Sequence, residues 1–539
     1  MMDITRQPHP LALRDAISDE AAAWLTQRLG RQANLCADSR RIAAGDAFFA
    51  RGGQRFSADQ HIASAVQAGA AAVLLEADDA LAAVKEIAGP VPTLRVPLLA
   101  RRMGMIASAF YGRPSMTMQI IAVTGTNGKS TVTAALGHAL ARCGISTAVI
   151  GTLGVGLFPA DCDVGFEPSW DDQATGGLTS PDAVDLQRLL RDLRSKNITV
   201  VALEASSVGL IQGRLSGCAI KAAAFTNLSH DHLDIHGTME RYAQAKALLF
   251  SCPSLGTMVV NTDDAYAPLM WQATDLHIQR IAVGRHWPEN AQVGIRADGE
   301  QATIDGWQFQ IYGTGKAVDL AGPLRLPVAG RHNIHNALIV AGCMLAMGID
   351  SEKIRRELSE FRLPAGRCQM LVHATGPWAC VDYAHSPDAL TRILEALRPI
   401  AEARAGRLVC VFGCGGDRDP AKRPMMGEVA ARGADRVVLT SDNPRRESAQ
   451  KILQEILAGV PEQLRDKVQS QPDRAAAIMM AIHEAKASDV VLIAGKGHER
   501  IQVIADQTIP FSDVEHAIRA QETWHPSHQP QPAHGEAHA

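Results

Sequence analysis

The sequence predicts an α/β protein of three domains, and three observations support this fold class. The chain has 539 residues, more than the roughly 250 to 300 that a single hydrophobic core usually serves. Two separate stretches alternate short apolar runs with amphipathic segments, which is typical of parallel sheets covered by helices on both faces. Polar and glycine-containing segments follow these apolar runs, at the strand ends where open α/β sheets bind ligands.

The first domain is expected over residues 1–115. Ala-rich helical stretches and short apolar runs such as residues 71–75 alternate there, and Gly112, Arg113 and Pro114 then interrupt the pattern. This part of the chain is expected to form a compact α/β unit.

The central domain is expected over residues 116–362. Apolar runs at residues 119–125, 147–152, 198–206 and 221–227 predict strands, and helices are expected from Ser130 and from Pro181. The stretch from Phe158 to Gly177 is expected to be a surface loop.

A second doubly wound domain, similar to a Rossmann domain, is expected over residues 363–524. Its predicted strands are residues 378–384, 407–413, 435–442 and 489–495, and its predicted helices lie near residues 388–397 and 473–485. The last residues, 525–539, hold no core-forming hydrophobic side chains, so a disordered tail is expected there, with metal binding by its histidines as the weaker alternative.

Composition and charge exclude several classes of function. The chain carries 53 Lys and Arg against 57 Asp and Glu, a formal net charge of −4, and lacks the basic excess of nucleic-acid binders. The apolar run from Ala337 to Ile349 is too short to span a bilayer, and the first residues lack a secretory pattern. We therefore expect a cytoplasmic protein with small-molecule partners, without nucleic acid or membrane insertion. The ten cysteines form no CxxC pairs, so neither disulfides nor structural zinc are expected.

A predicted phosphate-binding loop is the strongest motif. It lies between a predicted strand and a predicted helix, where backbone amides can surround phosphates. Lys129 would reach the terminal phosphates of ATP, and Ser130 would offer its hydroxyl to Mg²⁺. An ordinary glycine turn would explain neither the Lys-Ser-Thr sequence nor the strand before it. The expected ATP-binding residues here are Gly125, Thr126, Asn127, Gly128, Lys129, Ser130 and Thr131.

This loop resembles that of the Mur ligases and folylpolyglutamate synthetases. Val123 stands where the common phosphate-loop pattern has its first glycine, and the variant Gly-Thr-Asn-Gly-Lys-Ser is the one that this family carries. The resemblance extends over nearly the whole chain after Leu35. It includes the segments at residues 203–207, 226–234 and 242–246, which match the family's metal and catalytic segments in order.

The resemblance implies a catalytic and metal-binding group of Lys129, Glu204, His232 and Lys246. Glu204 and His232 suit cation binding at strand ends, where Mg²⁺ can neutralise phosphate oxygens. In the family, the equivalent of Lys246 is carbamylated, which turns an ammonium into an anion that helps to hold the second Mg²⁺. Taken singly, these residues would be a helix cap, a buried histidine and a solvated lysine. A zinc hydrolase with His232 and His236 is disfavoured because HExxH lacks its glutamate here.

The resemblance also assigns residues to the rest of ATP. Asn333 and Asn336, in the segment 330–336, resemble the family's adenine-contacting helix start. Asp382 is assigned to the ribose, and Arg367 and His385 are assigned to phosphates, from the third domain.

A nucleotide-sugar site is implied by further segments. The residues expected to bind UDP-N-acetylmuramoyl-dipeptide are Ser39, Gln54, Arg55, Phe56, Thr179, Ser180, Ser206, Gln212 and Arg214. Arg214 suits a carboxylate or a pyrophosphate. Val208 departs from the family pattern, which often has histidine after the paired serines. Without the resemblance, most of these residues would be interpreted as turn and surface groups.

An amino-acid site is implied in the third domain, where the segment 441–445 matches the family members that add meso-diaminopimelate. The expected contacts are Arg418, Asp442, Asn443, Pro444, Arg445, Gly495 and Glu499. Diaminopimelate differs from lysine by a distal carboxylate, which a guanidinium fork such as Arg445 can bind, while Glu499 can meet the distal ammonium. A Pro turn with a solvent-facing arginine is the plain alternative.

The resemblance therefore implies an ATP-dependent ligase of peptidoglycan precursor synthesis, and so of cell-wall biogenesis, cell shape and cell division. ATP and Mg²⁺ would act on UDP-N-acetylmuramoyl-L-alanyl-D-glutamate and meso-diaminopimelate through an acyl phosphate. The alternatives are a lysine-adding homologue, a folylpolyglutamate synthetase-like ligase and a non-catalytic nucleotide-binding module. We expect a monomer.

Overall fold

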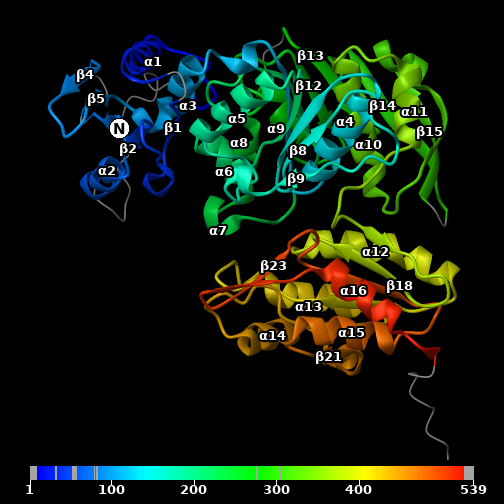
Figure 1. The fold of residues 1–539 in the computed structure, drawn as a ribbon. Helices are drawn as coiled ribbons and strands as arrows, with labels where there is room; N and C mark the ends of the chain where they lie inside the picture. Colours follow the sequence, from blue (N-terminus) through cyan, green and yellow to red (C-terminus); the bar gives the residue numbers. More distant parts are fainter. Residues whose placement is uncertain are drawn as a thin grey trace, which may run out of the picture.

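The computed structural model describes residues 9–30, 33–50, 58–77, 79, 83–274, 277–303 and 306–526. Gln54, Arg55 and Phe56 of the expected nucleotide-sugar site, and all but the first two residues of the expected tail, lie outside these residues. The described residues form three large sheets and one two-stranded ribbon. Figure 1 shows the first sheet beside the central one, and the third body below the central one. The α/β fold with three sheets confirms the predicted fold class.

The first sheet has five strands, in the order β1-β2-β3-β5-β4. All its pairings are parallel except that of β4 with β5. Its strands are β1 (Leu35–Cys36), β2 (Ala47–Ala50), β3 (Ala72–Glu76), β4 (Lys85–Ile87) and β5 (Thr93–Val96). Its helices are α1 (Ala16–Arg28), α2 (Ala58–Gln67) and α3 (Leu99–Phe110). Val184 of the central part also packs into this core, so the first sheet does not bury its apolar side chains alone.

The central sheet has eleven strands, in the order β16-β15-β14-β13-β12-β11-β6-β10-β7-β8-β9. Its parallel middle strands are β6 (Gln119–Thr124), β7 (Thr147–Gly151), β10 (Val200–Glu204), β11 (Ile220–Phe225), β12 (Thr257–Asn261) and β13 (Gln279–Val283). At one edge, β14 (Val293–Thr303) pairs with the antiparallel β15 (Gly306–Gly313), which pairs with β16 (Gly322–Leu326). At the other edge, β7 pairs with the antiparallel β8 (Gly154–Phe158), which pairs with β9 (Trp170–Asp171).

Both faces of the central sheet are covered because its middle strands bury apolar side chains on each face. Ile121 and Val123 of β6 pack on one face, and Ile120 and Ala122 pack on the other. The helices of this part are α4 (Lys129–Arg142), α5 (Ala183–Ser195), α6 (Ser207–Ile211), α7 (Leu233–His236), α8 (Met239–Ala247), α9 (Ala267–Gln272), α10 (His332–Ala346) and α11 (Ser351–Ser359). The predicted doubly covered parallel sheet is thus confirmed.

The stretch from Phe158 to Gly177 corrects one sequence-based expectation. It is more than a surface loop, because β9 within it adds the edge strand of the sheet. The Trp170 ring lies 6.0 Å from that of Phe158, edge to face. Part of this stretch therefore extends the sheet, and Trp170 packs against Phe158.

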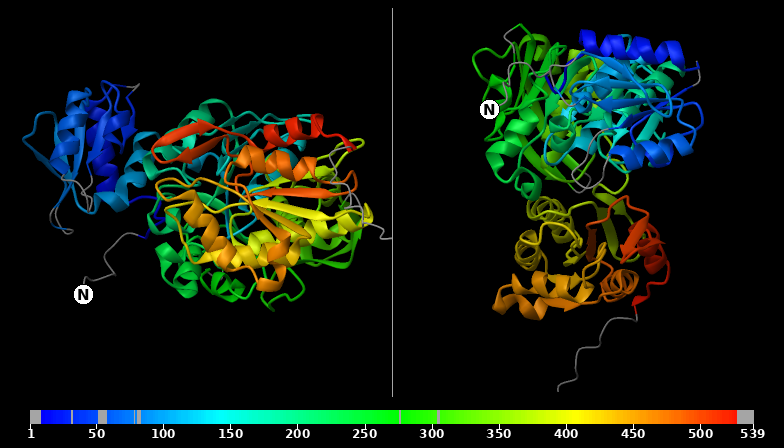
Figure 2. Two further views of the ribbon diagram at one scale, coloured as in Figure 1. Left: turned by 90° about the horizontal axis from the view of Figure 1, so that it is seen from below. Right: turned by 90° about the vertical axis from the view of Figure 1, so that its left-hand side faces the viewer.

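The third sheet has six strands, in the order β17-β18-β22-β19-β20-β21. Its strands are β17 (Gln369–Leu371), β18 (Trp378–Asp382), β19 (Leu408–Phe412), β20 (Arg436–Leu439), β21 (Val468–Ser470) and β22 (Val490–Ala494). The helices are α12 (Pro387–Ala403), α13 (Lys422–Gly433), α14 (Ala449–Ala458), α15 (Arg474–His483) and α16 (Asp513–Glu522), and the ribbon is β23 (Ile501–Ile504) with β24 (Gln507–Pro510). Figure 2 shows this body in two further views.

Candidate active site

The phosphate loop begins where β6 ends, and β6 lies between β10 and β11 in the sheet. Val123 pairs with Glu204, and Thr124 pairs with Phe225. Because parallel neighbours end at the same edge, the loop, Glu204 and the segment after β11 meet there. They line a cavity of about 390 Å³ between the central and third parts of the chain.

Two glycines let the loop pass close to its neighbours. Gly125 has φ +151°, and a Cβ there would lie 1.8 Å from Thr226 Oγ1. Gly128 has φ +88°, and a Cβ there would lie 2.6 Å from Asn336 Oδ1. Space therefore requires glycine at Gly125, whereas at Gly128 an added Cβ would displace the Asn336 amide and the left-handed backbone favours glycine.

Lys129 lies within the loop that it is expected to serve. Its Nζ donates to the carbonyl oxygens of Gly125 and Thr126, both at 2.8 Å. Burial lowers the pKa of this lysine, although nearby Glu204 acts in the opposite direction. The ammonium is thus held where the phosphates of a nucleotide would approach the loop.

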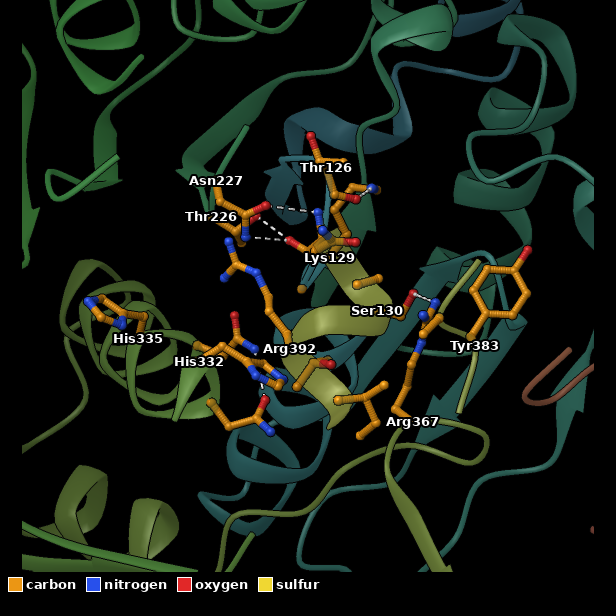
Figure 3. A pocket seen from close by; sticks show the side chains of 18 of the residues that line it. Thr126, Lys129, Ser130, Thr226, Asn227, His332, His335, Arg367, Tyr383 and Arg392 are labelled. Atoms are coloured by element: carbon orange, nitrogen blue, oxygen red, sulfur yellow. Dashed lines mark hydrogen bonds between the residues drawn. The ribbon is translucent and has the colours of Figure 1, made fainter. Parts of the chain in front are cut away.

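Two residues after β11 hold the loop in shape. Asn227 Oδ1 accepts from Asn127 N at 3.0 Å, and Asn227 Nδ2 donates to Asn127 O at 3.0 Å. Thr226 Oγ1 donates to the same carbonyl at 2.6 Å. Figure 3 shows these bonds beside Lys129. We did not predict either residue as a site residue, although both belong to the segment 226–234 that carries the resemblance.

Glu204 ends β10 with a buried carboxylate. Its Oε1 accepts from Thr152 N, and its Oε2 accepts from Thr152 Oγ1, each at 3.0 Å. These bonds orient the carboxylate at the cavity, together with the expected metal-binding residue Ser130.

His232 precedes α7 and also lines the cavity, with a side chain that is 48% exposed. His236, one helical turn further, is instead buried, and its Nε2 lies 2.9 Å from Ser207 Oγ. The two histidines therefore have different surroundings, one at the cavity and one inside the fold.

Lys246 is buried beneath the loop. Its Nζ donates to Gly125 O at 2.8 Å and lies 4.5 Å from the centre of the Tyr242 ring. Burial, with the neighbouring Lys129 ammonium, lowers the pKa of Lys246 well below its usual value. Lys246 therefore lies close to the loop but is not among the residues that line the cavity, as Glu204 and His232 are.

The protein side chains alone do not make a closed metal site. Among the described residues, no group of three or more His, Cys, Asp and Glu side chains is placed to hold a metal ion. Ser130, Glu204 and His232 supply oxygen and nitrogen atoms around the cavity, which suits Mg²⁺ because that ion usually takes few protein ligands and shares phosphate oxygens.

The third part of the chain supplies the opposite wall of the cavity. Arg367 Nη2 donates to Ser130 Oγ at 3.2 Å, and its guanidinium lies 4.5 Å from the centre of the Tyr383 ring. Asp382 accepts from Cys368 N and Ala384 N, and burial raises the pKa of this carboxyl. His385 also lines the cavity. The expected nucleotide residues of both parts therefore meet.

Asn333 and Asn336 begin α10 at the same cavity. Asn333 Nδ2 donates to Ala329 O at 2.7 Å, and Asn336 Nδ2 donates to Asn333 Oδ1 at 2.9 Å. The two amides therefore support each other beside Gly128 of the loop.

Arg392 of α12 is a further cavity residue that we did not predict, and Asp388 of the same helix contacts the phosphate loop. Asp388 Oδ2 accepts from Asn127 Nδ2 at 2.9 Å, which joins α12 to the phosphate loop. Arg392 Nε donates to Asp388, and Figure 3 shows the Arg392 side chain extending toward Asn227. The i,i+4 spacing of an acid and an arginine directly after the segment 382–385 was the available signal.

The expected nucleotide-sugar residues of the central part form one hydrogen-bonded group. Ser180 Oγ lies 3.1 Å from Ser206 Oγ, and Arg214 Nη1 donates to Ser180 O at 2.8 Å. Gln212 Oε1 accepts from Arg214 at 2.7 Å. Thr179 is adjacent and contacts Thr152.

Ser39 lies between β1 and β2 of the first sheet, outside this hydrogen-bonded group. Its Oγ lies 3.5 Å from His61 Nδ1.

The expected amino-acid residues gather at the ends of β19, β20 and β22. Arg445 has a left-handed backbone, with φ +49°, and the ribbon holds it through Arg445 N to Val503 O at 3.0 Å and Ala505 N to Arg445 O at 2.7 Å. Its Nη1 donates to Gly416 O at 2.7 Å.

Asn443 Nδ2 donates to Glu499 Oε2 at 2.9 Å, across two strand ends. A Cβ added at Gly495 would lie 2.9 Å from Asp442 Oδ2. Pro444 is buried, and Arg418 is exposed. The loops after β20 and β22 are thus in contact.

The fold and the site define a phosphate-loop nucleotide-binding protein whose cavity is completed by a second doubly wound body. Mur ligase middle domains match residues 123–344, and the Mur ligase glutamate ligase domain matches residues 366–497. The chain belongs to the Mur ligase family.

Three relatives show how far the similarity extends. A UDP-N-acetylmuramoyl-L-alanyl-D-glutamate--2,6-diaminopimelate ligase from Janthinobacterium sp. (strain Marseille) is 39% identical over 93% of this chain and 96% of its own length. The protein of the same name from Ectopseudomonas mendocina (strain ymp) is 41% identical over 92% and 96%. A solved structure of a ligase with that name has a TM-score of 0.61, with 32% identity over 91% of this chain and 94% of the other.

None of the described helices combines the length and the apolar character that crossing a bilayer requires.

Proposed function

We propose that this chain is the ATP-dependent ligase that adds meso-diaminopimelate to UDP-N-acetylmuramoyl-L-alanyl-D-glutamate. The observation that carries the proposal is the polar group at the ends of β20 and β22, where Arg445, Asn443 and Glu499 are held by backbone and side-chain bonds. A guanidinium and a carboxylate on neighbouring loops match the distal carboxylate and ammonium of diaminopimelate. Relatives about 40% identical over most of the chain carry the corresponding name.

The reaction has two steps. The γ-carboxylate of the D-glutamyl group attacks the γ-phosphate of ATP and gives an acyl phosphate and ADP, and the amine of diaminopimelate then displaces phosphate. Gly125, Gly128 and Lys129 bind and orient the phosphates, and Arg367 approaches from the third part of the chain. Bound Mg²⁺ would supply positive charge to the phosphate oxygens, held by Ser130, Glu204 and His232. Positioning and charge carry the catalysis, so no protein nucleophile is required.

Lys246 takes part as a carbamate in this proposal. A buried ammonium beside Lys129 and expected cations is unfavourable, and carbamylation would replace it with an anion. Its burial under Gly125 supports the assignment, because a solvated lysine would not lie there.

The domain bounds that we propose are 1–115, 116–362 and 363–524, with a tail at 525–539, because each large sheet lies within one of these ranges. Asp382 would hold the ribose, and Asn333 and Asn336 would contact the adenine. Ser39, with Gln54, Arg55 and Phe56, would bind uridine, and Thr179, Ser180, Ser206, Gln212 and Arg214 would bind the muramoyl peptide. We place the reaction in the cytoplasm and expect a monomer.

A phosphate-release assay tests the proposed function. Release should require ATP, the UDP-muramoyl dipeptide and meso-diaminopimelate together, and omission of any one should abolish it. Release with lysine in place of diaminopimelate would favour the lysine-adding homologue, and release with folate and glutamate would favour a folylpolyglutamate synthetase. ATP binding without release under any combination would favour a non-catalytic nucleotide-binding module.

A further inference from the structure

Lys496 follows β22 at the proposed amino-acid site, and its side chain is 0% exposed. A buried ammonium is costly unless it has partners. Lys496 Nζ donates to Glu499 Oε2 at 2.8 Å and to Asn443 Oδ1 at 3.0 Å, and Asp442 Oδ1 lies 3.8 Å away. One buried cation therefore joins the loop after β20 to the loop after β22.

The two oxygens of Glu499 have different surroundings. Oε2 accepts from Lys496 Nζ and also from Asn443 Nδ2 at 2.9 Å. Within the described part of the chain, no hydrogen bond to Oε1 is found, and the Glu499 side chain is 28% exposed. A carboxylate with one oxygen engaged and the other open is oriented to accept a hydrogen bond from a ligand.

We propose that Lys496 is a positioning residue for the amino-acid substrate: it holds Glu499 Oε2 so that Oε1 faces the substrate ammonium. This inference rests on the proposed function, since it concerns the same amino-acid site. Lys496 itself is buried and does not contact the substrate. Its effect passes through Glu499, and Asn443 shares the task, because Asn443 bonds both Lys496 and Glu499.

A second buried cation fixes the strand ends on which this arrangement depends. Arg474 pairs with Asp513 through two bonds of 2.7 Å, and both side chains are 0% exposed. Arg474 also donates to Ser441 O at 3.2 Å and to Ala494 O at 2.9 Å. These carbonyls immediately precede Asp442 and Gly495. Arg474 thus holds the backbone of both loops through these carbonyls, and Lys496 holds the Asn443 and Glu499 side chains on them.

The substitution Lys496→Met tests the proposal because it removes the charge while keeping most of the side-chain volume. The KM for diaminopimelate should rise roughly tenfold or more, while the KM for ATP stays within about twofold, since ATP binds at the central loop. Lys451→Met, in α14 with a side chain that is 64% exposed, is the matched control and should change neither value. An unchanged KM for diaminopimelate would overturn the proposal.

A double-mutant cycle separates positioning from a general structural role. Lys496→Met, Glu499→Gln and the double variant are compared by kcat/KM for diaminopimelate. The loss caused by Lys496→Met should be much smaller once Glu499→Gln is present, because Lys496 acts through that carboxylate. Equal losses in both backgrounds would mean that Lys496 acts independently of Glu499, and would overturn the proposal.

A general defect of the variant and a failure of the proposed function can both be told apart from a failure of this proposal. If Lys496→Met does not bind ATP as the parent does, Lys496→Gln, which keeps a donor in a shorter side chain, replaces it in the cycle. A parent that ligates lysine or another amino acid instead of diaminopimelate would overturn the proposed function, and the cycle run with that amino acid would still test Lys496.

Discussion

Lys129 is held by two carbonyl oxygens of its own loop, so its charge is placed before any phosphate arrives. Lys129→Ala should lower the rate of ligation by about 100-fold or more, because a preorganised charge at the phosphates is lost. The midpoint of thermal unfolding should stay close to that of the parent. Phosphate release and a thermal melt measure the two effects. Lys196→Ala, at an exposed position after α5, should retain parental activity, and a Lys129→Ala variant that ligates at the parental rate would contradict the assignment.

Lys246 offers a test of chemical rescue. Lys246→Ala should be almost inactive, and formate or acetate in the buffer should partly restore phosphate release, because a small carboxylate can occupy the space of the proposed carbamate. The same additives should not rescue Lys129→Ala, whose missing group is a cation. Full activity of Lys246→Ala without additives would show that the lysine has no catalytic part.

Arg445 carries the selectivity for the distal carboxylate in the proposed function. Arg445→Ala should lower kcat/KM for diaminopimelate by roughly thirtyfold to several thousandfold, which corresponds to the ~2 to 5 kcal/mol lost when one partner of a desolvated charge pair is truncated. Activity with lysine should fall much less, and ATP binding should be nearly unchanged. The measured quantity is the ratio of kcat/KM for the two amino acids, and an equal ratio in parent and variant would contradict this role.

The phosphate loop as an element depends on its close contact with α10. Gly128→Ala should weaken ATP binding strongly, because the added methyl group would meet Asn336 Oδ1 at 2.6 Å in a backbone with φ +88°. Strain of this kind costs about 1 to 3 kcal/mol, or roughly fivefold to more than a hundredfold in affinity. Calorimetric titration with ATP measures it.

Gly348 provides a matched control for this prediction. It has a comparable φ of +77°, but nothing lies within 4 Å of an added Cβ. Gly348→Ala should therefore lower stability by about 1 to 3 kcal/mol through backbone strain and leave ATP affinity unchanged. Equal effects of the two substitutions on ATP binding would mean that contact with α10 is unimportant.

The contact between the central and third bodies is tested where α12 meets the phosphate loop. Asp388→Ala removes the acceptor of Asn127 Nδ2 and the partner of Arg392. Hydrogen bonds of this type contribute about 0.5 to 1.5 kcal/mol, so the KM for ATP should rise roughly twofold to tenfold while the thermal midpoint is retained. Glu395→Ala, on an exposed position of the same helix, should have no effect. A KM for ATP that is unaffected by Asp388→Ala would show that this contact does not support nucleotide binding.

The amino-acid sequence was sufficient to predict the α/β class, the parallel sheets and the phosphate loop. These features follow from local signals: apolar strands alternate with helices, and Gly125, Gly128 and Lys129 stand between a strand and a helix. The resemblance also grouped residues that lie far apart in the chain, and in the structure Arg367 donates to Ser130; the assignment of Arg367 to the phosphates stays a prediction.

The side chains that support these residues became evident only in the folded structure. Asp388 reaches Asn127 from another part of the fold, and Lys496 reaches Asn443 across two strand ends. The residues 158–177, expected as a loop, contain the edge strand β9. Local sequence cannot specify such contacts, because they depend on the order of strands in a sheet and on how two bodies meet. The burial of Lys246 and Arg474 has the same origin: a charged side chain signals solvent in the sequence, and only its surrounding partners make it stable inside the fold.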